Sequence, residues 1–119
     1  MRIGIIVRDE TMDVCTGKSC LDAFYGRKDS FAEYGAEVEL CAFTTHNGDL
    51  QRKIDKMKEA GITCVHLGKC MRNECSEYEE LAQRLAQDFD VVGYSHGPQE
   101  YPARPTVSIK RGKSCGVDS

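Results

Sequence analysis

The chain has 119 residues, of which 40% are hydrophobic and 29% are charged, and its formal net charge is -3. This size and balance are those of one folded domain, and they exclude a disordered chain, a collagen-like chain and a coiled coil. No apolar run approaches the roughly 20 residues that a membrane span needs, and the weak negative charge disfavours nucleic acid as a partner.

The first half of the chain alternates between strand and helix patterns. Residues 2–7 form a short, branched, apolar run that is typical of a buried strand. A helix is predicted over 20–34, with Ser19 as its cap and Gly35 as its end. Residues 37–43 then alternate in the manner of a second strand.

The second half repeats this alternation. Residues 49–60 show the clearest helical periodicity, and residues 62–67 form a third strand. Ser76 and Glu79 match a capping box that opens a third helix. Residues 90–94 complete the series as a fourth strand.

The composition changes after the fourth strand. All three prolines follow it, at Pro98, Pro102 and Pro105. Such a cluster marks the end of the regular core, so we divide the chain into an α/β domain at 1–97 and an extension at 98–119. Within the extension, 106–109 is a candidate edge strand, and 110–119 is expected to be a flexible tail.

Four strands that alternate with three helices predict an α/β fold. We expect a three-layer, four-stranded, mostly parallel sheet of the Rossmann or flavodoxin type. Such sheets bind ligands beyond the carboxyl ends of their strands. The loops predicted at those ends carry sulfur and imidazole groups, at Cys15, Cys20, His46, Cys70, Cys75 and His96. These side chains are therefore expected to converge on one edge of the sheet.

Cysteine is the most informative residue type. The chain has 7 cysteines, fewer than a disulfide scaffold would have, and no export signal is visible at its start. We expect reduced thiols in the cytoplasm, where clustered cysteines more often serve metal or redox chemistry. Cys41 and Cys64 lie inside predicted strands and are expected to be small buried residues, and His66 is expected to be hydrogen-bonded in the core.

The cysteine spacing favours a metal site. Cys15 and Cys20 are separated by four residues, as are Cys70 and Cys75, and this spacing suits zinc. His96, and His46 with it, would complete a thiolate and imidazole set. Zinc or another transition metal is the expected cofactor, with an iron–sulfur cluster as one form. Unrelated loop thiols in a metal-free protein are the alternative.

Two other functions stay open. Cys20 and Cys75 are predicted at helix N-termini, where the dipole lowers a thiol pKa, so a thiol redox or nucleophilic enzyme is one. Gly17, Lys18 and Ser19 resemble the end of a phosphate loop, so a small-anion site is the other. Whether the protein is an enzyme stays undecided, and a homodimer through a sheet edge or the proline-containing extension is an open alternative.

Several stretches resemble the CGGC domain family, small bacterial and archaeal proteins to which metal binding is attributed for their cysteines and histidines. These are the opening M-R-I-G-I-I, the segment from Cys15 to Phe24, residues 30–40, Ala60 to Met71, Cys75, and Ser95-His96. The resemblance spans about residues 1–97 and implies the α/β fold and a metal site. The C-G-G-C signature is replaced by residues 44–49, where His46 could stand in for one thiol.

Overall fold

A four-stranded sheet forms the middle layer of the protein. The computed structural model describes residues 1–100 and 104–112. The strands are β1 (Arg2–Val7), β2 (Glu39–Thr45), β3 (Ile62–Leu67) and β4 (Asp90–Val92). They lie in the order β2-β1-β3-β4, and every neighbouring pair is parallel. The predicted α/β class is confirmed.

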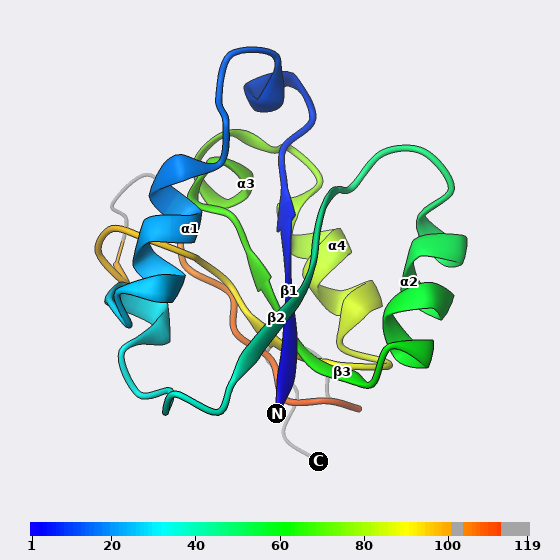
Figure 1. Cartoon of the computed structure of the whole chain (residues 1–119). Coiled ribbons are helices and arrows are strands. Elements are labelled where there is room, and N and C mark those ends of the chain that lie inside the picture. Colours follow the sequence, from blue (N-terminus) through cyan, green and yellow to red (C-terminus); the bar gives the residue numbers. More distant parts are fainter. Residues whose placement is uncertain (101–103, 113–119) are drawn as a thin grey trace.

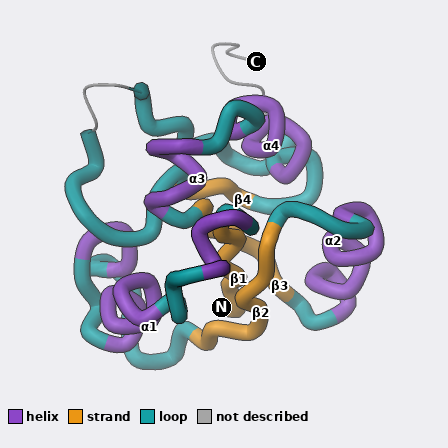
Figure 2. The backbone as a smooth tube through the Cα atoms, turned by 90° about the horizontal axis from the view of Figure 1, so that it is seen from above, coloured by secondary structure: helices purple, strands orange, loops and turns teal. Residues whose placement is uncertain are grey.

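Helices cover both faces of this sheet (Figures 1 and 2). The helices are α1 (Lys18–Tyr25), α2 (Leu50–Glu59), α3 (Lys69–Glu74) and α4 (Tyr78–Leu85), with short 3-10 turns at Glu10–Asp13 and Asp29–Phe31. Seen along the strands, α1 lies on one face, and α2 and α4 lie on the other (Figure 2). Among the described residues, no helix is long and apolar enough to cross a lipid bilayer.

The alternation along β1 explains why there are three layers. Ile3, Ile5 and Val7 pack in a cluster with Phe24 of α1, whereas Ile6 packs in a second cluster with α2 and α4. Successive side chains of a strand point to opposite faces, so a strand that is apolar on both sides needs helices on both sides. β1 is central in the sheet and is buried in this way from residue 3 onward.

The first predicted helix was too long. α1 begins at Lys18, with Gly17 and not Ser19 as its N-cap, and it ends at Tyr25 before Gly26. Arg27 and Asp29 then adopt positive φ angles of 52° and 53°, which no α-helix allows. Gly17 has a φ of 82°, and a Cβ there would lie 2.7 Å from the Phe43 ring, so only glycine fits.

Other boundaries were partly correct. β3 has the predicted bounds, and Asp49 caps α2 by accepting a hydrogen bond from the Arg52 backbone N–H. β2 is shifted by two residues toward the carboxyl end, and β4 stops at Val92. The predicted capping box is wrong, because Glu77 is the N-cap of α4 and no side chain caps it. α3 was not predicted, and its six residues were interpreted as loop.

The two cysteines predicted to be buried in strands differ. Cys64 of β3 is 2% exposed, which confirms the prediction. Cys41 of β2 is exposed, so its prediction is wrong. The register of β1 against β2 shifts at this point, with Ile3 opposite Leu40 and Gly4 opposite Ala42. Cys41 is therefore the extra residue of a bulge on an edge strand, where it faces outward.

The chain after β4 packs back onto the sheet. Ile109 forms an isolated antiparallel bridge with Val91, in place of the edge strand predicted at 106–109. Arg72 of α3 is fully buried and donates hydrogen bonds to the carbonyl oxygens of Pro98 and Gln99. The predicted tail lies outside the described residues from position 113 onward, and the division at residue 97 stays a prediction.

Tyr78 joins this returning segment to the core. Its hydroxyl donates to the Gly93 carbonyl at 2.6 Å and accepts from the Val107 N–H at 2.9 Å, and the side chain is fully buried. Tyr78→Phe leaves both backbone groups unpaired, so we expect a loss of roughly 1–3 kcal/mol of unfolding free energy in urea titrations. Tyr25→Phe, at a residue 72% exposed, should change it little; equal losses would contradict this role for Tyr78.

Candidate metal centre and thiol cavity

The structure places the six predicted metal ligands in two separate groups. Four of them line one cavity of about 450 Å³ on the α1 side, namely Cys15, Cys20, Cys70 and His96. We call this the thiol cavity. Cys75 packs instead in the core cluster of α2 and α4, and His46 lies near it. The expected convergence therefore takes place at two separate points.

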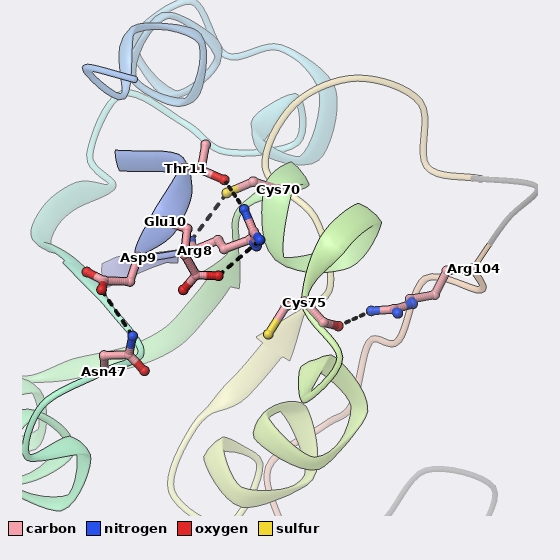
Figure 3. Close-up of polar contacts among 8 residues, drawn as sticks. All are labelled: Arg8, Asp9, Glu10, Thr11, Asn47, Cys70, Cys75 and Arg104. Carbon is pink, nitrogen blue, oxygen red and sulfur yellow. Dashed lines mark hydrogen bonds and ion pairs between the residues drawn. The ribbon is translucent and has the colours of Figure 1, made fainter. Parts of the chain in front are cut away.

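The unpredicted helix α3 explains this division. Cys70 lies in its first turn, and Cys75 is its C-cap. Five residues of helix rotate the chain by about 140° between them. Cys70 consequently packs against the α1 cluster, whereas Cys75 packs against the α4 cluster. In the close-up, the Cys75 sulfur points away from Arg104, which bonds to the Cys75 carbonyl (Figure 3).

Each sulfur of the thiol cavity has a polar hydrogen-bond partner. Cys15 Sγ accepts from the Gly17 N–H at 3.3 Å, and Cys70 Sγ accepts from the Arg8 N–H at 3.3 Å (Figure 3). Cys20 Sγ lies 3.0 Å from Ser95 Oγ. The described cysteines are all free thiols.

Burial dominates the electrostatics of this cavity. It raises the pKa of Cys20, the Ser95 hydrogen bond opposes that rise, and the nearby Cys70 and Cys15 sulfurs add to it. The lowered pKa predicted for Cys20 is therefore wrong, because the side chain is buried at the third helical position and not exposed at the helix end. Burial, and then Lys69, lower the pKa of His96, so its imidazole is neutral at pH 7.

The candidate anion-binding residues are largely engaged in other contacts. The Lys18 ammonium forms an ion pair of 2.5 Å with Asp22, one turn further along α1. The Gly17 N–H donates to the Cys15 sulfur. Ser19 lines the thiol cavity beside them. An anion at this point would have to compete with a carboxylate and a sulfur, so the anion alternative stays a prediction without added support.

The second group joins an imidazole, a thiol and a carboxylate. Ligand atoms of His46, Cys75 and Glu77 all lie within 4.8 Å of one another, and we call these residues the His46 group. It is the one group of three such side chains found in the part of the chain that the structure describes. Nδ1 of His46 is buried and has no hydrogen-bond partner there. Glu77 was missed, because an acidic residue before a helix ordinarily indicates only a favourable helix dipole contact.

The His46 loop is held in place from two sides. Lys53 Nζ donates to the carbonyl oxygens of Thr45 at 2.9 Å and Asn47 at 2.7 Å. Asn47 Nδ2 donates to Asp9 at 3.1 Å, which joins the loop to the one that follows β1 (Figure 3). Gly48 has a φ of 83°, which allows the turn into α2. These hydrogen bonds fix the backbone on both sides of His46 and so hold its imidazole in position.

A third histidine belongs to the core, as predicted. His66 is fully buried, and its Nε2 lies 2.6 Å from the Tyr34 hydroxyl. Its Nδ1 lies 2.9 Å from Ser30 Oγ, and the Ser30 hydroxyl donates to the Ser95 carbonyl. Ser30 therefore accepts from Nδ1–H, and Nε2 accepts from Tyr34. Burial lowers the pKa of His66 to about 4, so it is neutral and is a structural group.

Fold and site together define a three-layer α/β protein with cysteine and histidine side chains gathered at the carboxyl edge of its sheet. The CGGC domain family matches residues 2–96, and the chain belongs to that family. No curated protein and no solved structure matches it.

Proposed function

We propose that this protein binds a soft transition-metal ion, with zinc the first candidate, through His46, Cys75 and Glu77. The observation that carries the proposal is the grouping of three ligand atoms within 4.8 Å. The unpartnered, buried Nδ1 of His46 supports it, because buried polar atoms are nearly always satisfied and a metal would satisfy this one. The metal binding expected of the CGGC family agrees with it.

The donor set favours zinc. Thiolate, imidazole and carboxylate are the three ligand types that zinc accepts in proteins, whereas an iron–sulfur cluster requires about four thiolates. Three protein ligands leave one coordination position for water or a substrate. A cavity of about 320 Å³, lined by His46, Glu77, Glu80 and Arg84, adjoins the group. A zinc ion there would act as a Lewis acid toward an oxygen ligand.

Glutamate variants test the site directly. Glu77→Gln keeps the side-chain size and removes the carboxylate charge, so it should weaken zinc binding by at least the roughly 10- to 100-fold that loss of an outer-sphere partner costs. Glu80→Gln is the matched control, because Glu80 lines the same cavity outside the group. Competition with a zinc-sensitive dye measures both. Equal affinities for the two variants would contradict the proposal.

The thiol cavity is the second candidate location for a metal. This location is supported by three cysteines and a neutral His96 that line the same cavity. Elemental analysis of protein purified without oxygen and without a histidine tag separates the two locations. We expect Cys70→Ser to keep the metal. Loss of the metal in Cys70→Ser alone would move the site to the thiol cavity.

The location and the oligomeric state of the protein are proposals as well. The cytoplasmic location follows from the expectation of reduced thiols, and a homodimer through a sheet edge or the proline-containing extension is an open alternative. The finer identity of the metal rests on the donor set. The cavity beside the His46 group leaves room for a small-molecule ligand.

A further inference from the structure

The thiol cavity lies where open parallel sheets bind ligands. In the order β2-β1-β3-β4, the chain leaves β1 in one direction and β3 in the other. The loops after these two strands separate and leave a crevice at their carboxyl ends. Thr11 and Cys15 of the first loop and Lys69 and Cys70 after β3 line the cavity. Its volume of about 450 Å³ lies in the roughly 300–1,000 Å³ range of small-ligand sites.

The three sulfurs are graded in depth. Cys15 is exposed, Cys70 is half-buried, and Cys20 is 6% exposed. The Lys69 N–H donates to Ser95 Oγ at 3.1 Å, which leaves the Ser95 hydroxyl hydrogen free to point at the Cys20 sulfur. A ligand that enters from solvent therefore meets Cys15 first. Deeper in the cavity it meets Cys20, to whose sulfur the Ser95 hydroxyl already donates.

These thiols suit covalent chemistry better than metal binding. Within the described residues, no three of these cavity ligands meet the 4.8 Å criterion that the His46 group meets. We propose that the thiol cavity performs thiol–disulfide exchange on small organic disulfides, with Cys15 as the attacking thiol and Cys20 as the resolving thiol. This function is separate from metal binding by the His46 group and does not depend on it.

The exchange takes place in two steps. The Cys15 thiolate attacks one sulfur of the disulfide RSSR; a Cys15–S–SR bond forms, the RS–SR bond breaks, and RS⁻ leaves and takes a proton from water. The Cys20 thiolate then attacks Cys15 Sγ, which forms the Cys15–Cys20 disulfide and releases the second RS⁻. The proton that leaves Cys20 is passed to this second RS⁻, so two electrons and two protons in total convert RSSR to two RSH. His96 lines the same cavity as a neutral imidazole, so it is the group we assign to carry this proton from Cys20 to the second RS⁻.

The assignment of roles follows from accessibility. Exposed Cys15 can reach a disulfide in solution, and its sulfur receives the Gly17 N–H. Burial raises the pKa of Cys20, which makes it a slow thiol toward solvent reagents. The raised pKa of Cys20 slows the second step less, because the attack of Cys20 on the Cys15 sulfur is intramolecular.

The test uses bis(2-hydroxyethyl) disulfide and mass spectrometry on full-length protein carrying Cys41→Ser and Cys115→Ser. We expect this protein to form the Cys15–Cys20 disulfide and to retain no adduct. With Cys20→Ser or Cys20→Ala added, a mixed disulfide should accumulate on Cys15. With Cys15→Ser added, the disulfide reagent should oxidise the remaining cavity thiols at least tenfold more slowly than it oxidises the parent protein. Thermal unfolding of each variant shows that it is folded.

Two outcomes would overturn the proposal. One is a Cys15–Cys70 disulfide in folded Cys20→Ala, formed as fast as the original bond, because Cys20 would then not be the resolving thiol. The other is a lasting adduct on Cys15 that matches the one on Cys41 in wild-type protein, because Cys15 would then be an ordinary exposed thiol. Zinc affinity, measured in the same samples, reports separately on the His46 group.

Discussion

Replacing Cys75 by serine is expected to abolish tight zinc binding. Cys75 supplies the only sulfur of the His46 group, and zinc prefers thiolate to the weakly acidic hydroxyl that would replace it. The affinity should fall by more than the roughly 100-fold upper range for loss of an outer-sphere partner. The Cys75 backbone should stay in place, because its N–H bonds to the Met71 carbonyl and its own carbonyl accepts from Arg104.

A burial-matched variant separates metal loss from damage to the core. Cys64 is also buried and free, and it packs on the α1 side of the sheet. Cys64→Ser should therefore carry a similar cost of burying a hydroxyl and should keep its zinc. Competition titrations at pH 7 compare the two. If Cys75→Ser bound zinc as tightly as Cys64→Ser, the His46 group would not be the metal site.

Acid is expected to destabilise the protein through His66. The unfolded state binds a proton at His66 near pH 6.5, whereas burial holds the folded-state pKa at about 4. The contribution of neutral His66 is complete above pH 6.5 and is lost as the pH falls toward 4. The free energy of unfolding should decrease by roughly 1.4 kcal/mol per pH unit, or about 3 kcal/mol in total.

Two measurements check this expectation. Urea unfolding at several pH values should show the slope between pH 6 and 4.5 in wild-type protein and a shallower slope in His66→Gln. Proton NMR of the His66 ring follows the group directly and needs no variant. A ring resonance that titrated with a midpoint near 6.5 in folded protein would show that the network with Tyr34 and Ser30 does not keep His66 neutral.

The two sites differ in what their surroundings supply. The His46 group contains acidic Glu77 and lies beside Glu80, and these carboxylates favour a cation. The thiol cavity instead offers backbone N–H groups and a hydroxyl as hydrogen-bond donors to its sulfurs. The two proposals thus assign metal binding to one side of α3 and thiol–disulfide exchange to the other.

The sheet could be predicted from the sequence because its strands are short apolar runs with strong periodicity. The first strand and the third were predicted with their correct bounds. α3 could not be predicted from its pattern of buried residues, because it buries only Met71 and Arg72. An arginine in a sequence is ordinarily interpreted as exposed, so Arg72 did not indicate a buried helix face. The end of α1 was predicted incorrectly, because both Gly26 and Gly35 can end a helix and the apolar spacing favoured Gly35, whereas the helix ends before Gly26.

The gathering of cysteines and histidines at one edge was predicted by topology, because all parallel strands present their carboxyl ends there. Topology could not assign each residue to a face of the sheet. That assignment depends on α3, which rotates Cys75 away from Cys70. Glu77 could not have been selected, since nothing in its sequence neighbourhood distinguishes it from other acidic residues that precede a helix.

X-ray absorption at the zinc edge of the loaded protein reports which side chains hold the metal. Zinc held by the His46 group should show one sulfur at about 2.3 Å, together with nitrogen and oxygen neighbours at about 2.0–2.2 Å. The Cys70→Ser variant should give the same spectrum. A shell of three sulfurs that loses one member in Cys70→Ser would place the metal in the thiol cavity and rule out the His46 group as the metal site.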